Sequence, residues 1–114
     1  MSNEVKQLIQ QLNKGAVDFN SVIQIIENNY IFTPYEFKNG HVVNVKNSNN
    51  GSCKIFAFGL INQLSEQATL NAFGHFYTID VLQSPDGEDH QNIRNFMQFG
   101  WKGISFKTPA LILK

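Results

Sequence analysis

The sequence predicts an α+β fold, in which about five helices pack with a small antiparallel sheet in one domain over residues 1–114. Three observations support this prediction. Apolar residues recur at helical spacing in several segments, an Asn-Gly pair lies between two short apolar runs as in a β-hairpin, and two more short apolar runs flank a Lys-Thr-Pro turn near the C-terminus. With 42% hydrophobic residues and ten phenylalanines, the chain is expected to bury a phenylalanine-rich core.

Two helices are expected at the beginning of the chain. Ser2 or Asn3 can cap the first helix, and Gly15 suits its end. Its apolar stripe consists of Val5, Leu8, Ile9 and Leu12. Asp18 is placed to cap a second helix that ends near residues 28–29. The stripe of this helix consists of Phe19, Val22, Ile23 and Ile26.

The following segment, YIFTPYEFKNGHVVNV, has the pattern of strands rather than of a helix. Pro34 opposes a helix, and the Asn39-Gly40 pair between apolar-bearing runs predicts a hairpin. The short apolar runs at residues 104–106 and 110–113 are expected to add strands to the same small sheet.

A buried central helix is expected in the middle of the chain. The polar run KNSNNGS predicts an exposed loop, and Ser52 at its end stands where a helix cap is expected. The next nine residues, CKIFAFGLI, are apolar almost all round, which favours a buried helix. Six of these residues fit a buried strand equally well, so the strand remains an alternative.

Two further helices are expected in the second half. Ser65 can cap the first of them, and Gly74 together with the branched residues that follow it predicts a bend or late fraying. The sequence SPDGED predicts a turn, after which Asp89 can cap the last helix and Gly100 can end it.

Composition and charge exclude several classes of partner. Nine basic and nine acidic residues give no net charge, so no long-range field favours nucleic acid. No run approaches the roughly 20 apolar residues of a membrane span, and the first residues lack the uninterrupted apolar segment of a cleavable secretory signal, so neither is expected. A single cysteine excludes an internal disulfide and a multi-cysteine zinc site. A monomer without membrane or nucleic-acid partners is therefore expected.

Cys53 and His90 are the candidate reactive pair. If Ser52 caps the central helix, Cys53 lies in its first turn, where unpaired amides and the helix dipole stabilise a thiolate. His90 is the candidate base, with Asp89 or Asn92 completing the arrangement of a cysteine hydrolase. Alternatively, Cys53 is a small buried hydrophobe and His90 is a first-turn surface residue. This second reading is the more frequent one for a lone cysteine that opens an apolar run.

The segment DGEDH, residues 86–90, offers three carboxylates and an imidazole to a divalent cation. It lacks the roughly twelve-residue spacing of a calcium loop, and carboxylates before a helix ordinarily act as caps. No metal and no cofactor are therefore expected.

The segments FTPYEFKNG, NNGSCKIFAF, DVLQSPDGEDHQNIRNFM and GWKGISF together resemble the HopJ type III effector family. The resemblance extends from about Asn13 through nearly the whole chain. It implies a small bacterial protein of mixed helix and strand in one domain. Such a protein is cytoplasmic as synthesised, with secretion through a type III system left open. The resemblance supplies no catalytic residue.

Two polar blocks of this resemblance, residues 50–54 and 89–94, stand at expected helix starts, and we expect both to open onto one pocket. Asn50 and Asn92 are candidate hydrogen-bonding groups there, and Arg94 is a candidate anion-binding fork. The function expected is that of an effector-like protein that binds a protein or small-molecule partner. The alternatives are a thiol hydrolase or transferase that uses the Cys-His pair, and a structural or stress-related cytosolic protein without a catalytic site.

Overall fold

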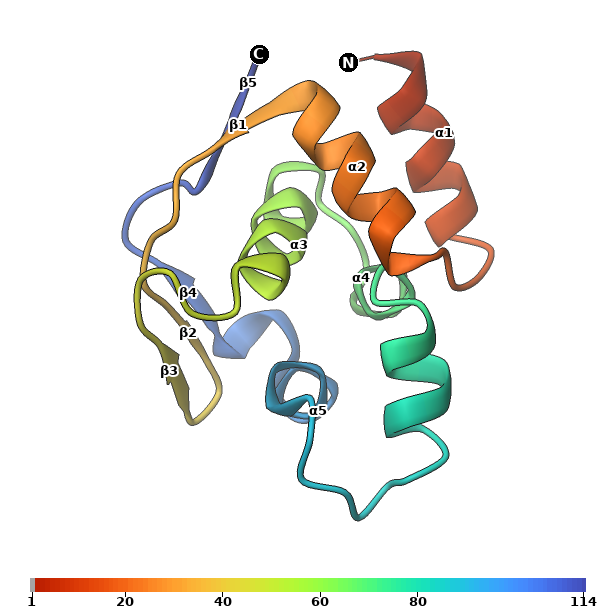
Figure 1. Cartoon of the computed structure of the whole chain (residues 1–114), viewed down its shortest axis with the longest axis vertical. Coiled ribbons are helices and arrows are strands. Elements are labelled where there is room, and N and C mark those ends of the chain that lie inside the picture. Colours follow the sequence, from red (N-terminus) through yellow and green to blue (C-terminus); the bar gives the residue numbers. More distant parts are fainter. Residues whose placement is uncertain (1) are drawn as a thin grey trace.

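The computed structural model describes residues 2–114 and confirms the α+β class. The elements in chain order are α1 (Asn3–Leu12), α2 (Phe19–Asn29), β1 (Tyr30–Phe32), β2 (Phe37–Asn39), β3 (Val42–Asn44), α3 (Asn50–Ile61), α4 (Glu66–Asn71), the π-helix η1 (Phe76–Val81), α5 (Gln91–Phe99), the 3₁₀-helix η2 (Gly100–Gly103), β4 (Ile104–Phe106) and β5 (Leu111–Leu113). In Figure 1, α3 lies at the centre, between the strands on one side and α1 and α2 on the other.

The strands form two small antiparallel sheets instead of the one that the sequence predicted. One sheet has the order β3-β2-β4, in which Phe37 pairs with Asn44 on one side and with Phe106 on the other. The other consists of β1 and β5, with Tyr30 opposite Leu113. The prolines that follow β1 and β4 interrupt both strand runs, because proline lacks the N–H that a ladder needs. Each run therefore contributes to two sheets.

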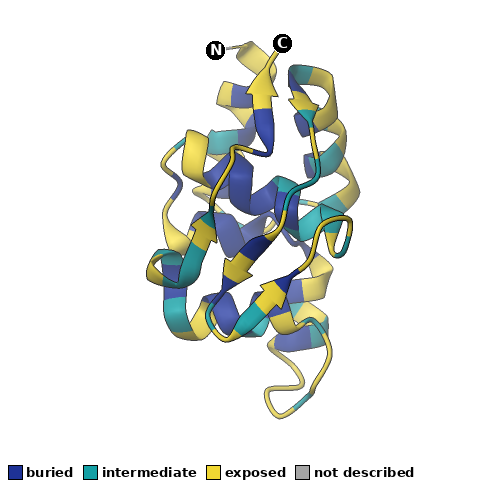
Figure 2. Cartoon of the chain, turned by 90° about the vertical axis from the view of Figure 1, so that its left-hand side faces the viewer, coloured by how far each residue is buried: buried dark blue, intermediate teal, exposed yellow. Residues whose placement is uncertain are grey.

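The core is rich in phenylalanine, as predicted, and α3 passes through it as a helix, so the strand alternative for this segment is wrong. The fully buried phenylalanines are Phe37, Phe56, Phe58, Phe73 and Phe96. Figure 2 shows the buried part of this central helix behind the exposed strands. Across residues 2–114, no helix combines the length and the apolar content that a membrane crossing requires.

The helix predicted after Ser65 is broken at Gly74. This glycine has φ of 57°, and a Cβ atom there would lie 2.8 Å from the backbone oxygen of Val17. Only glycine fits such a left-handed position against a neighbouring main chain. The chain continues as η1 in a new direction, and this change places Phe76 and Asp80 near the start of α5.

Helix caps were predicted correctly at three starts and wrongly at two. Ser2, Asp18 and Ser65 accept hydrogen bonds from the first turns of α1, α2 and α4. The cap of α3 is Asn49 rather than Ser52, and the cap of α5 is His90 rather than Asp89. Both of these caps adopt the left-handed conformation. As a result, α3 begins earlier than a cap at Ser52 would allow, and α5 begins one residue later than a cap at Asp89 would allow.

Candidate functional site

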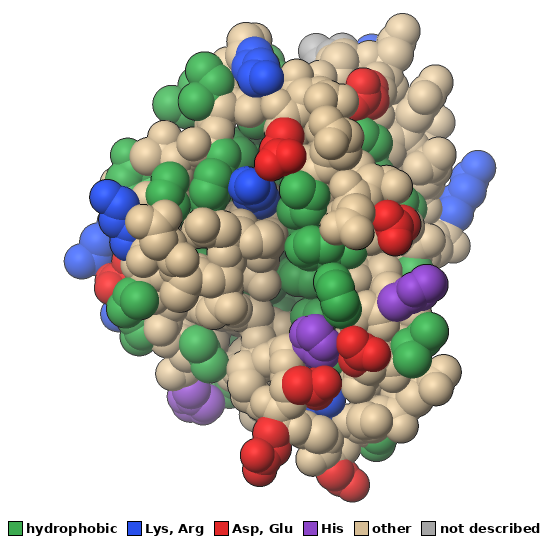
Figure 3. Space-filling view, viewed as in Figure 1, with side chains coloured by type: hydrophobic (Ala, Val, Ile, Leu, Met, Phe, Trp, Pro, Cys, Tyr) green, Lys and Arg blue, Asp and Glu red, His purple; other side chains and the backbone are tan. Residues whose placement is uncertain are grey.

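The starts of α3 and α5 border one cavity of about 360 Å³, which we call the α3–α5 cavity. It is lined by Phe19, Val42, Asn49, Gly51, Ser52, Phe73, Phe76, His90, Gln91, Asn92 and Ile93. Figure 3 shows hydrophobic side chains gathered in a hollow of this face, with a histidine and acidic side chains beside it. The two polar helix starts singled out in the sequence therefore border the same cavity.

Both helix starts lack a side-chain cap. The cap residues Asn49 and His90 have φ of 53° and 50°, and neither side chain bonds to the first turn of its helix. Within residues 2–114, unpartnered first-turn N–H groups are those of Asn50, Gly51 and Ser52 on α3, and of Gln91 and Asn92 on α5. These groups carry the positive end of each helix dipole, which favours a negative charge or a strong acceptor.

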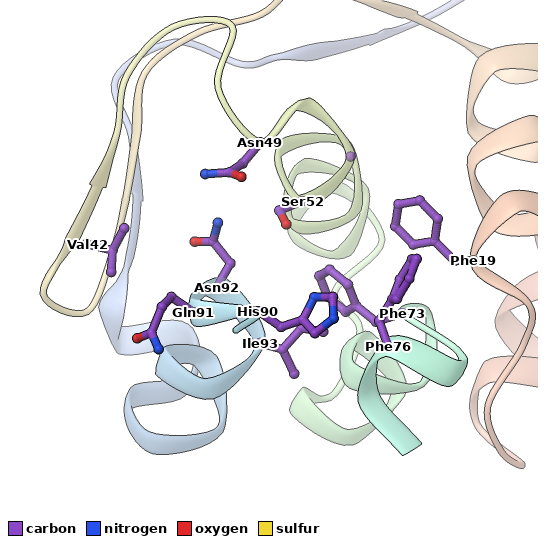
Figure 4. A pocket seen from close by; sticks show the side chains of 11 residues that line it. Phe19, Val42, Asn49, Ser52, Phe73, Phe76, His90, Gln91, Asn92 and Ile93 are labelled. Carbon is purple, nitrogen blue, oxygen red and sulfur yellow. The ribbon is translucent and has the colours of Figure 1, made fainter. Parts of the chain in front are cut away.

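The opposite wall of the cavity is aromatic (Figure 4). Phe19 begins α2, Phe73 follows α4, and Phe76 begins η1. The Phe19 and Phe76 rings pack edge to face with centroids 5.1 Å apart, and the Phe76 ring lies 5.1 Å from the His90 ring. Gly51 allows Phe19 to approach α3, because a Cβ atom there would lie 2.7 Å from Cζ of Phe19. A flat apolar group can pack against this wall.

His90 is paired with a carboxylate that sequence reasoning did not find. Its Nε2 lies 3.0 Å from Oδ2 of Asp80 and 3.8 Å from Oδ2 of Asp89. Nε2 donates to Asp80 in the neutral ring, so Nδ1 is the nitrogen that can accept a proton. Among residues 2–114, Nδ1 has no hydrogen-bond partner. The contact depends on the break at Gly74; the sequence predicts a bend there, but no local pattern gives its direction or identifies Asp80 as the partner of His90.

Cys53 does not line the cavity. Its side chain is 1% exposed, and its Sγ lies 3.9 Å from the backbone oxygen of Tyr35, to which the thiol can donate. Burial raises the pKa of the Cys53 thiol above its ordinary value of 9.0, although the Tyr35 hydrogen bond and the charge of Lys54 act in the opposite direction. Burial is the largest of these causes, so the folded environment disfavours the thiolate that a nucleophile requires.

We expect iodoacetamide to modify native Cys53 at least about a hundredfold more slowly than the cysteine of the urea-unfolded chain at pH 8, because the reaction needs an accessible thiolate. The raised pKa also predicts that the fold loses stability above pH 9.0, where the unfolded chain ionises before the folded protein does. Intact mass spectrometry over time measures the modification. Rapid reaction of the native protein at pH 7 would contradict this assignment.

Arg94 is engaged in holding the loop before α5. Its guanidinium donates to Oδ1 of Asp89 at 2.7 Å and to the backbone oxygens of Asp89, Ser84 and Pro85. The hydrogen bond from Arg94 is the main reason why the pKa of Asp89 lies below its ordinary value. Arg94 lines a separate hollow together with Val81 and Met97, so the structure does not bring it into the α3–α5 cavity.

Asn92 lines the cavity, but its side-chain amide belongs to a buried network. Its Oδ1 accepts from Asn39 and Asn44 at 3.0 Å each, and its Nδ2 donates to Oδ1 of Asn44 at 2.9 Å. Asn49 also donates to Asn44, at 2.8 Å. Asn50 lies in the first turn of α3 without lining the cavity.

Of the five residues predicted for the site, the structure thus brings His90 and Asn92 together at the cavity. The polar residues that sequence reasoning missed are Asn49, Ser52, Asp80 and Gln91. Ser52 directly precedes Cys53, and the sequence pattern predicts it only as a helix cap. Within residues 2–114, no three histidine, cysteine, aspartate or glutamate side chains gather in a way that could hold a metal ion.

Comparisons with known proteins match nearly the whole chain. A family model described as HopJ type III effector protein matches residues 5–111. A crystal structure titled as that of the unknown function protein VPA0580 is 52% identical in sequence, with a TM-score of 0.94. The match covers 100% of this chain and 97% of that one. No curated protein matches the chain.

Proposed function

The chain belongs to the HopJ type III effector family, and we propose that it acts by binding a small ligand in the α3–α5 cavity. The ligand class that fits is a flat apolar or aromatic group bearing a small anion or strong hydrogen-bond acceptor. The description of the family supports secretion through a type III system as part of the same proposal.

The observation that carries this proposal is the meeting of two uncapped helix starts at one cavity. A helix start attracts anions through its unpaired N–H groups and its dipole, and each such interaction contributes about 0.3–1 kcal/mol. Here Gly51 and Ser52 on α3 stand with Gln91 and Asn92 on α5 around the same space. An acceptor group of the ligand would lie between the two starts.

The aromatic wall supports the presence of a flat apolar or aromatic group in the ligand. Phe19 and Phe76 form an edge-to-face pair at the cavity, and Phe76 is 39% exposed although its ring is large. Burying such a partly exposed ring against a ligand is favourable, because apolar surface leaves water. A volume of about 360 Å³ suits a molecule with one ring and a small polar group.

Phenyl phosphate is a suitable probe because it joins a ring to an anion. We expect it to bind at least about tenfold more tightly than either inorganic phosphate or benzyl alcohol, each of which lacks one half of the recognition. Titration followed by amide NMR shifts measures these affinities. The largest shifts should fall on Gly51, Ser52, Gln91 and Asn92. Equal binding of the three probes, or shifts spread over other elements, would contradict the proposal.

The variant Ser52→Glu separates charge from size. Ser52 is in the first turn of α3, where a carboxylate interacts favourably with the helix dipole, so this variant should remain folded. The same carboxylate should repel an anionic probe and weaken phenyl phosphate binding by at least about tenfold. Ser52→Gln is the matched neutral control. It has nearly the same size as Ser52→Glu but no charge, so it should retain most of the affinity for phenyl phosphate.

A further inference from the structure

We propose that the α3–α5 cavity is also a hydrolytic site, in which Ser52 attacks a carboxylic ester and His90, oriented by Asp80, transfers the proton. The substrate class is an ester of a small aromatic or apolar acid. This inference rests on the proposed function, because it places the same kind of molecule in the same cavity.

The pair formed by Asp80 and His90 supplies the base and its positioning residue. A carboxylate 3.0 Å from Nε2 fixes the ring and favours the tautomer with a proton on that nitrogen. The same carboxylate stabilises the imidazolium that forms when Nδ1 takes a proton. In Figure 4 the His90 ring lies within the cavity, between the first turn of α5 and the phenylalanines.

Ser52 is the nucleophile of this arrangement. Successive residues of a helix point about 100° apart, so Ser52 faces the cavity while Cys53 faces the core. Within residues 2–114, the hydroxyl of Ser52 has no hydrogen-bond partner, and no direct bond joins it to His90. Hydrogen bonds between a nucleophile and its base are often long in unliganded sites and shorten when substrate is bound.

The unpaired N–H groups of the two helix starts complete the arrangement. When Oγ of Ser52 attacks the carbonyl carbon, negative charge develops on the carbonyl oxygen. Gly51 and Ser52 on α3 and Gln91 on α5 line the cavity, and their N–H groups have no partner within residues 2–114, so they are available to that oxygen. The acyl group of the substrate would pack against Phe19 and Phe76, where an apolar surface is available.

The reaction balances without a cofactor. Oγ of Ser52 bonds to the carbonyl carbon while its proton passes to Nδ1 of His90, and the resulting oxyanion is held by the helix N–H groups. The bond to the leaving alkoxide then breaks, and that oxygen receives the proton from His90. Water attacks the acyl-serine, gives one proton to His90, and the proton returns to Ser52 as the acid leaves. The net change is ester plus water to acid plus alcohol.

A fluorophosphonate probe tests the nucleophile, because it forms a stable bond with an activated serine hydroxyl. We expect one adduct per chain, mapped by peptide mass spectrometry to Ser52. Ser52→Ala should lose the adduct, whereas Ser105→Ala, which changes an exposed serine on β4, should retain it. Absence of an adduct, or its location on another residue, would overturn the inference.

Asp80→Asn tests the positioning residue. It should slow labelling by roughly a hundredfold, since the ring loses its fixed tautomer, while phenyl phosphate affinity stays within about twofold. If Asp80 had only a structural role, the substitution would lower both the labelling rate and the affinity for phenyl phosphate. Ser52→Cys in a Cys53→Ala background provides a second check, because a thiol at the first turn should react with iodoacetamide at least about tenfold faster than native Cys53.

Phenyl phosphate titration of the same samples separates the two proposals. Binding without fluorophosphonate labelling would overturn the hydrolytic inference and leave the ligand site intact. Absence of both would overturn the two together.

Discussion

Replacing Phe56 by alanine will lower the free energy of unfolding by about 3–5 kcal/mol. Phe56 is fully buried in α3, and its ring packs against those of Phe37, Phe73, Phe96 and Trp101 at centroid distances of 5.0–6.5 Å. Truncation therefore removes contacts with β2, α5 and the segments that follow α4 and α5. The surrounding rings come from separate elements and cannot all move into the space left, so a cavity cost adds to the lost burial. Urea unfolding followed by fluorescence measures the loss.

Phe76→Ala is the matched control, since the same atoms are removed from a ring that is 39% exposed. We expect a cost of about 1 kcal/mol, because part of this ring already contacts water in the folded protein. Equal costs for the two variants would show that α3 does not form the centre of the core. Phe76→Ala should also weaken phenyl phosphate binding, whereas a folded fraction of Phe56→Ala should retain it.

Local patterns in the sequence predict most of the helices because each pattern acts within a few residues. Ser2, Asp18 and Ser65 each satisfy a backbone donor of the helix that follows, so the residue type alone marks the start. The apolar content of CKIFAFGLI likewise predicts a central buried element. These predictions depend on interactions between neighbours along the chain.

The candidate site could be predicted only in part, because a small error at a helix start changes which side chain faces which neighbour. Asn49 adopts a left-handed conformation, so α3 begins three residues earlier than a cap at Ser52 would allow. Ser52 then becomes a helical residue at the cavity, and Cys53 faces the core. The sequence analysis selected this segment but placed its candidate chemistry on Cys53, whereas Ser52 is the neighbouring residue that lines the cavity.

Contacts between distant segments lie outside any local pattern. β1 pairs with β5 although β2, β3, all elements from α3 to η2, and β4 lie between them along the chain, and no propensity identifies that partner. Asp80 reaches His90 only because the chain turns at Gly74 and because Arg94 holds the loop before α5. Asn39 was interpreted as a hairpin turn residue, yet its side chain bonds to Asn92 on α5. Such pairs require the tertiary structure.

Asn92→Ala will lower the free energy of unfolding by about 2–4 kcal/mol, because it leaves buried amide groups without partners. Three side-chain hydrogen bonds disappear, one with Asn39 and two with Asn44, and both of these residues are at most 1% exposed. Asn39 already has an unpaired Oδ1, so its side chain would retain only the bond to the backbone oxygen of residue 92. The network joins the β2–β3 hairpin to α5, and thermal unfolding measures its loss.

Asn50→Ala supplies the comparison that decides what Asn92 does. Within residues 2–114 the Asn50 side chain has no hydrogen-bond partner, so we expect a cost below about 0.5 kcal/mol. A purely structural role for the Asn92 amide predicts reduced stability, with phenyl phosphate affinity unchanged in the fraction that stays folded. If Asn92→Ala were as mild as Asn50→Ala and abolished binding instead, the amide would be a ligand group, as the sequence alone indicated. The two measurements together therefore distinguish a residue that builds the wall of the cavity from one that contacts its ligand.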